Sequence, residues 1–165
     1  MINKKGKKTN FIPFTTDGKT SVVMWDFQPV FTKDGNETEV GTWKVEKFNK
    51  KLSHDEIKTF ITEFYNKKID EKILMGMVWK GMKIWLSSEN QFNYKAAYDL
   101  AVQTNGKNLP VMFKFGEANE PIYYTFQTIE ELSDFYMSSM QFIQMTLEEG
   151  WRLKDSINWE DYKVF

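Results

Sequence analysis

The sequence predicts an α+β protein in which short antiparallel hairpins pack against two or three helices, the last of them long. Three observations lead to this prediction. Stretches in which apolar and polar residues alternate occur in pairs that are joined by turn sequences, as antiparallel hairpins require. Other stretches repeat apolar residues every three or four positions, as helices do. Two of these begin with a serine or threonine followed three positions later by a glutamate, the spacing of a capping box.

The first hairpin is expected between residues 23 and 48. Its turn should lie at Asp34 and Gly35, because an Asp-Gly pair favours tight hairpin turns. Pro29 lacks an N–H group, so its strand should lie at an edge or bend there. The first strand should carry four apolar side chains on one face, and the second strand two on its own face: Val23, Trp25, Phe27 and Phe31, then Trp43 and Val45.

Three helices are expected. The first should begin at Ser53 and end near Leu74, and the second should begin at Ser87 or Ser88 and end near Gln103. The third should begin at Thr128 and either end at Gly150 or continue through Leu153 and Ile157. The apolar stripes that we expect to be buried are Phe92, Ala96 and Leu100 in the second helix, and Ile129, Leu132, Tyr136, Met140, Ile143 and Leu147 in the third.

Two shorter hairpins should separate these helices, over residues 77–86 and 111–126. The organisation that follows has three parts. Residues 1–10 form a basic N-terminal arm that is expected to be disordered on its own. Residues 11–75 form a β-hairpin with a helix, and residues 76–165 form an α+β domain with an aromatic C-terminal tail. The last two parts are expected to share one continuous core.

Composition restricts the classes of function. The 165 residues include no cysteine and one histidine, His54, so disulfides, thiolate zinc sites and multi-histidine metal sites are excluded and no cofactor is expected. The 22 basic and 23 acidic residues nearly balance, and Arg152 is the one arginine, which disfavours nucleic-acid recognition except through the N-terminal arm. No apolar run approaches the roughly 18 residues of a membrane span, so we expect a soluble protein made inside the cell without a membrane partner.

Candidate contact residues lie at the two ends of the chain. The basic arm offers ammonium groups to a neighbouring subunit, although a solvated tail is the alternative. The aromatic C-terminal residues offer anchors for a partner, and packing on the chain's own core is an equal alternative. The candidates are Lys4, Lys5, Lys7, Lys8, Trp151, Trp159, Tyr162 and Phe165.

Residues 77–94, with 109–114, 124–126 and a closing helix that ends in Lys-Asp-Ser-Ile at 154–157, resemble a phage protein domain. That domain occurs in tail-fibre-related and tail-assembly proteins of double-stranded DNA phages. The variant in this chain is most similar to structural proteins of crAss-like phages that infect gut Bacteroidales. The resemblance covers residues 70–158, and the family has no established catalytic residues to transfer.

The resemblance implies a non-enzymatic structural component of a phage virion, in the tail or the head–tail connector, where it would form a ring, collar or fibre attachment. Its partners would be other tail, connector or fibre proteins and further copies of itself. It would be assembled in the host cytoplasm and reside in the virion. Two alternatives stay open: a tail-fibre assembly factor that is absent from the mature particle, and a glycan-binding adhesion module that uses exposed tryptophan and tyrosine.

Overall fold

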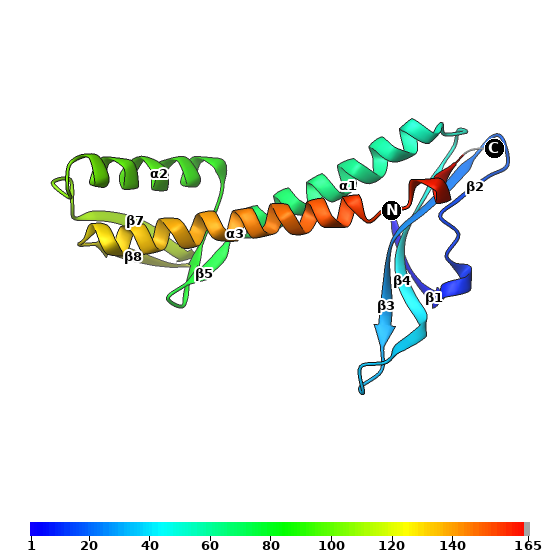
Figure 1. The fold of residues 1–165 in the computed structure, drawn as a ribbon, viewed down its shortest axis with the longest axis horizontal. Coiled ribbons are helices and arrows are strands. Elements are labelled where there is room, and N and C mark those ends of the chain that lie inside the picture. Colours follow the sequence, from blue (N-terminus) through cyan, green and yellow to red (C-terminus); the bar gives the residue numbers. More distant parts are fainter. Residues whose placement is uncertain (164–165) are drawn as a thin grey trace. The chain divides into compact units, whose positions relative to one another are not determined.

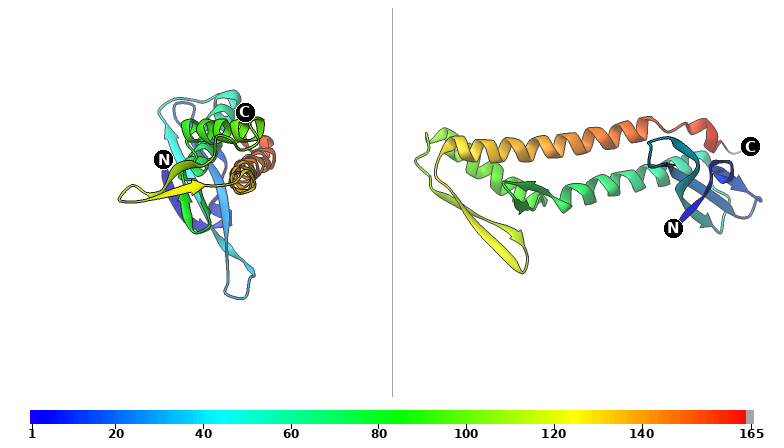
Figure 2. Two further views of the ribbon diagram at one scale, coloured as in Figure 1. Left: turned by 90° about the vertical axis from the view of Figure 1, so that its left-hand side faces the viewer. Right: turned by 90° about the horizontal axis from the view of Figure 1, so that it is seen from below.

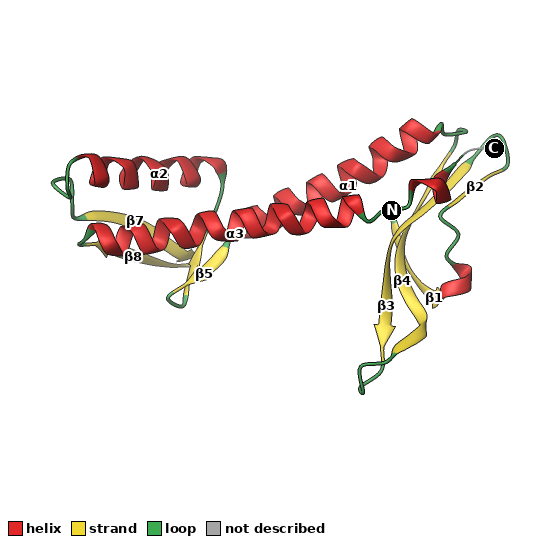
Figure 3. Ribbon diagram, in the orientation of Figure 1, coloured by secondary structure: helices red, strands yellow, loops and turns green. Residues whose placement is uncertain are grey.

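A computed structural model describes residues 1–163 and confirms the α+β class, with antiparallel strands, three α-helices and a long last helix (Figures 1 and 3). In chain order the elements are β1 (Ile2–Lys7), the 3₁₀ helix η1 (Lys8–Asn10), β2 (Phe14–Thr16), β3 (Ser21–Phe31), β4 (Glu37–Phe48), α1 (His54–Met75), β5 (Met77–Trp79), β6 (Met82–Ile84), α2 (Ser88–Gln103), β7 (Val111–Glu117), β8 (Glu120–Phe126), α3 (Ile129–Asp155) and the 3₁₀ helix η2 (Trp159–Tyr162). All three expected hairpins are present.

The chain divides into two compact units. Unit 1 contains residues 1–64 and the C-terminal segment from Ser156, and unit 2 contains residues 65–155. This division differs from the expected one, because it falls within α1 instead of after it. The C-terminal segment also belongs with the N-terminal residues.

Unit 1 is built on a four-stranded antiparallel sheet in the order β1-β4-β3-β2. The segment that we expected as a free arm is therefore its edge strand β1, which pairs with β4 from Ile2↔Val45 to Lys7↔Val40. The first part of α1 covers one face of the sheet, where the Trp25 ring lies edge-on to Phe60 at 5.0 Å between ring centres. Long-range pairing with β4 thus supplies the order that the sequence of β1 lacks.

A bulge in β3 interrupts the alternation that we expected, so Val23, Trp25, Phe27 and Phe31 do not share one face. The register shifts between Trp25 and Gln28, and Asp26 adopts a φ of 57°, in the left-handed region. Such an insertion turns the residues that follow it to the opposite face of the sheet. Phe27 consequently stacks on Trp43 instead of lying beside Trp25, and Phe31 is 57% exposed.

The start of α1 confirms the capping box. The Glu56 main-chain N–H donates to Ser53 Oγ at 3.2 Å, and the Ser53 N–H donates to Glu56 Oε2 at 2.8 Å. Lys50 forms an ion pair with the same carboxylate. The Lys50 ammonium and the Ser53 N–H together lower the pKa of Glu56 to about 2. These contacts fix the direction in which the chain leaves the sheet and enters the helix.

Unit 2 has an aromatic core. The helices α2 and α3 pack against the inner face of the β7–β8 hairpin, and β5–β6 lies beside them (Figure 1). Tyr94 of α2 is 3% exposed, and burial raises its pKa to about 12. Its hydroxyl donates to the main-chain oxygen of Trp85 at 3.2 Å. Its ring lies next to those of Phe113, Phe115 and Phe135. The core continues through Trp79, whose ring contacts Tyr124, Phe126 and Phe135.

The helix α2 is rotated from the orientation that we expected. Ser87 caps it as expected, by accepting a hydrogen bond from the Asn90 N–H at 3.2 Å. The buried side chains, however, are Tyr94 and Ala101. Phe92 is 71% exposed and Leu100 is 48% exposed, so the expectation that this stripe is buried is wrong.

The helix α3 runs past Gly150 to Asp155, which is the longer of the two expected endings. Of its expected stripe, Leu132 is buried, and Ile129, Tyr136 and Ile143 pack against the core with partial burial. The other buried positions, which the stripe did not include, are Phe135, Ser139, Thr146 and Gly150. Within unit 2, the part of α1 from Tyr65 onward runs alongside the second half of α3 (Figures 1 and 2). A Cβ at Gly150 would lie 2.1 Å from Ile69 Cδ1, so glycine permits this close approach.

Candidate functional site

The four candidate lysines lie together at the edge of unit 1. Lys4, Lys5 and Lys7 are in β1 and Lys8 begins η1, and all four are exposed. Lys8 Nζ lies 3.4 Å from Glu37 Oε1 and 5.8 Å from the centre of the Phe27 ring. The lysines are therefore displayed on a paired strand with a defined register instead of on a disordered tail.

An open groove of about 560 Å³ lies where β1 ends. Its lining combines two ammonium groups with two carboxylates: Lys7, Lys8, Thr9, Glu37, Thr38 and Glu39. Opposite charges face each other across it, and Lys8 already pairs with Glu37. The groove therefore offers no net charge that would select an anion or a cation.

Two of the aromatic candidates, Trp159 and Tyr162, lie side by side in unit 1. Tyr162 is buried in unit 1, where its hydroxyl donates to the main-chain oxygen of Met24 at 2.9 Å and burial raises its pKa. His54 Nδ1 donates to the Tyr162 main-chain oxygen at 3.1 Å. Trp159 is half-buried, with its ring centre 6.0 Å from that of Tyr162. For these two residues the structure favours the alternative of packing within the chain.

The remaining two aromatic candidates lie elsewhere. Trp151 belongs to α3 in unit 2 and is 46% exposed. Phe165 lies outside the described residues. Within the described residues, the candidates for an exposed aromatic anchor are therefore the partly exposed side chains of Trp151 and Trp159.

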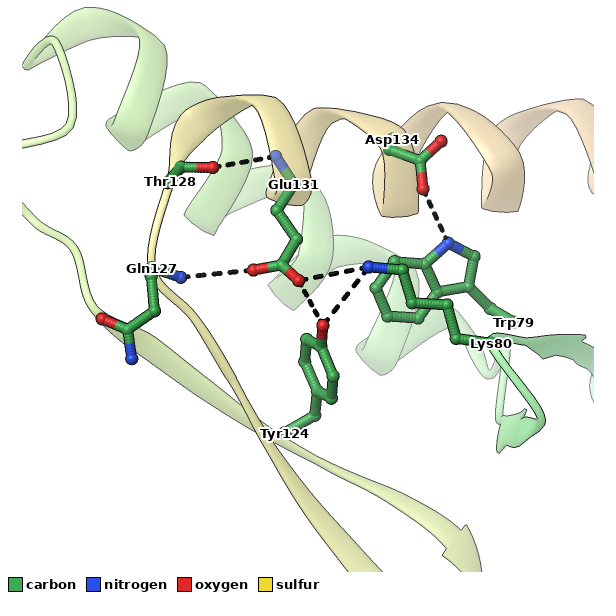
Figure 4. A network of polar contacts seen from close by, with 7 residues as sticks. All are labelled: Trp79, Lys80, Tyr124, Gln127, Thr128, Glu131 and Asp134. Carbon is green, nitrogen blue, oxygen red and sulfur yellow. Dashed lines mark hydrogen bonds and ion pairs between the residues drawn. The ribbon is translucent and has the colours of Figure 1, made fainter.

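Unit 2 contains a network of polar side chains that the sequence analysis missed (Figure 4). Glu131 of α3 accepts hydrogen bonds from the Tyr124 hydroxyl and from Lys80 Nζ, the latter at 3.2 Å. Lys80 occupies the β5–β6 turn, with a φ of 47°, and its ammonium lies 4.5 Å from the centre of the Trp79 ring. The network thus ties the β5–β6 turn and β8 to the beginning of α3.

The same glutamate belongs to the expected capping box at Thr128. The Glu131 N–H donates to Thr128 Oγ1 at 3.2 Å, as that motif requires. Its carboxylate, however, accepts from the Gln127 N–H at 3.5 Å instead of returning to Thr128. Because Tyr124 and Lys80 bind the Glu131 carboxylate, it does not bond to the Thr128 N–H. Of the expected capping box, only the hydrogen bond from the Glu131 N–H to Thr128 Oγ1 is present.

The hydrogen bonds of this network stabilise the charged forms of Lys80 and Glu131 and the neutral form of Tyr124. Hydrogen bonding to Glu131 raises the pKa of both Lys80 and Tyr124, and the Tyr124 hydroxyl, followed by Lys80, lowers the pKa of Glu131. A lysine or tyrosine that acts as a base or nucleophile needs a lowered pKa. Here each group is held more firmly in its resting protonation state, as in a stabilising ion pair.

The most exposed apolar feature of α2 is a row of three residues, Phe92, Ala96 and Leu100, which we call the α2 ridge. They are spaced four residues apart and therefore lie on one side of the helix. The ridge is the stripe that the sequence pattern assigns to a core, yet it faces solvent.

Within residues 1–163, no helix combines the length and the apolar character that crossing a membrane requires. Those residues also contain no group of three or more His, Cys, Asp or Glu side chains placed to hold a metal ion. No protein-family model, curated protein or solved structure matches the chain.

Proposed function

We propose that this chain is a non-enzymatic structural component of a bacteriophage virion, in the tail or the head–tail connector, and that it acts by packing against other subunits. The observation that carries this proposal is the exposed α2 ridge, in which Phe92 is 71% exposed. An exposed row of apolar side chains on one helix face is a candidate for burial against a partner. Aromatic residues are also enriched where protein interfaces are fully buried.

The phage context of the proposal rests on the resemblance carried by residues 77–94 and 109–114. Those residues include β5, β6, the start of α2 and the start of β7, which all belong to unit 2. The partners would be other tail, connector or fibre proteins and further copies of this chain. In a symmetric ring or fibre each contact is repeated, so a modest interface at the α2 ridge is sufficient.

The test is incorporation into particles when the α2 ridge carries a charge. Phage particles are produced with Phe92→Asp in place of the natural chain, and its copies per particle are counted by quantitative mass spectrometry. We expect at least about a tenfold loss, since interface aromatics commonly contribute more than the 1.4 kcal/mol that corresponds to tenfold in affinity. Incorporation at the natural level would contradict the proposed role of the ridge.

Met137→Asp is the matched control. Met137 is 58% exposed on α3, so the substitution introduces the same charge at an exposed apolar position on a different helix. We expect this variant to be incorporated normally. Thermal unfolding of both purified variants should remain close to that of the natural chain, which separates a lost contact from a lost fold. A chain that is made during infection but absent from particles would instead support the assembly factor.

A further inference from the structure

Strand β1 presents an unpaired edge. It is the end strand of the unit 1 sheet in the described residues, and it pairs along its inner edge with β4. That pairing is continuous over all six residues, from Ile2 to Lys7, without a bulge. The main-chain N–H and C=O groups that point outward along such an edge form a template for a further strand.

The charge on this edge is of one sign. Residues 1–10 contain four lysines and no acidic residue. Because side chains alternate between the faces of a strand, Lys5 and Lys7 lie on one face and Lys4 on the other. A strand added to β1 would therefore have ammonium groups beside it on both faces. Cross-strand pairs of opposite charge stabilise a sheet, and directly opposed like charges destabilise it.

We propose that the outer edge of β1 binds an extended acidic segment of a partner protein by strand addition. The main-chain hydrogen bonds would supply affinity, and the lysines would select glutamate or aspartate side chains. This inference deepens the assembly role proposed above by naming the chemistry of one partner, and it rests on that role for its biological context. The complementary charge is what identifies the occupant.

The occupant is another protein and not a second copy of this chain. Two β1 edges would oppose lysine to lysine, which is unfavourable. The opposite edge of the same sheet, β2, has three residues and no charge, and β8 carries one acidic residue, Glu120. None of these strands offers acidic side chains on both faces. The lysines thus discourage self-pairing of the sheet while favouring an acidic strand.

Binding of a defined peptide tests the proposal on the full chain. The probe is a fluorescein-labelled, end-blocked octapeptide of glutamate, valine and threonine, with glutamates at both odd and even positions so that they lie on both faces of the added strand. We expect saturable binding by fluorescence anisotropy, weakened by added salt, and slower amide hydrogen exchange over residues 2–7 when the peptide is bound. The control peptide replaces one central valine with proline, which keeps the charge and removes a main-chain donor. It should bind at least about tenfold more weakly.

A matched pair of variants locates the site. Lys5→Glu should weaken binding at least about tenfold, because an attraction becomes a repulsion. Lys33→Glu changes the net charge equally at an exposed position in the β3–β4 turn and should leave binding within about twofold. Equal binding of the proline peptide, equal effects of the two variants, or no binding by the natural chain would each overturn the proposal. If the chain enters particles but fails these tests, only the proposed edge site is refuted. If the chain passes them but is absent from particles, only the proposed virion role is refuted.

Discussion

The orientation of α2 predicts opposite consequences for two neighbouring aromatic residues. Phe92 retains less than a third of its side chain in contact with the protein, so Phe92→Ala removes about 0.5–1 kcal/mol of apolar burial. Alanine favours a helix more than phenylalanine does, by about 0.5 kcal/mol, and offsets much of this loss. Tyr94 is 3% exposed and contacts several rings of the unit 2 core. Tyr94→Ala should therefore lower the free energy of unfolding by about 3–5 kcal/mol.

Urea unfolding followed by circular dichroism measures both effects. Thermal unfolding should place the Tm of Tyr94→Ala about 6–20 °C below that of the natural chain and the Tm of Phe92→Ala within about 2 °C of it, at about 2–4 °C per kcal/mol. The reasoning would be refuted by a Phe92→Ala variant that loses several kcal/mol while Tyr94→Ala loses little. That result would place the ridge in a core and remove the surface on which the proposed function depends.

Two further predictions concern single contacts. Gly76 and Gly81 have similar positive φ angles of 73° and 78°, but a Cβ at Gly76 would lie 1.9 Å from the main-chain oxygen of Ile84, whereas nothing lies within 4 Å of one at Gly81. Gly81→Ala should cost about 1 kcal/mol of the free energy of unfolding and Gly76→Ala at least about 2 kcal/mol more, measured by urea unfolding, and equal costs would contradict the packing at Ile84. The lowered pKa of Glu56 stabilises the folded chain fully above its ordinary value of 4.5, and this stabilisation is lost as the pH falls toward about 2. Glu56→Gln should therefore lower the Tm above pH 5 and approach the natural Tm near pH 2, and a difference that does not change with pH would contradict the ion pair with Lys50.

Helix boundaries followed from local chemistry, whereas helix orientation did not. Ser53 and Ser87 cap their helices by contacts within three residues, which the sequence displays directly. In α2, however, two apolar rows compete, one through Phe92 and Leu100 and one through Tyr94 and Ala101. Both have helical spacing, so periodicity alone does not choose between them. The choice is made by the β7–β8 hairpin, whose Phe113 ring lies 5.0 Å from the ring of Tyr94.

The sheet of unit 1 depends on long-range pairing in the same way. The sequence of β1 has three lysines around a glycine and no apolar alternation, so nothing local indicates a strand. Its partner β4 lies more than thirty residues away and supplies the hydrogen bonds. The bulge at Asp26 is equally invisible from composition, because it depends on a main-chain conformation that aspartate adopts only occasionally.

The candidate contact residues were predictable in part. Exposure of the lysines follows from their charge, but their arrangement along a sheet edge required the structure. Tyr162 looks like a surface anchor in the sequence because it lies in a short aromatic tail. In the structure its ring is buried and its hydroxyl reaches Met24, 138 residues earlier in the chain. The network at Glu131 was hidden for the same reason, since Lys80 and Tyr124 meet only after both hairpins have formed.

The most direct test of the virion role is the copy number of this chain in purified phage particles, measured by quantitative mass spectrometry against the portal and tail proteins. The structural role predicts a fixed number of copies per particle, at a small symmetric multiple that is constant between preparations. Absence from particles, despite production of the chain during infection, would contradict it.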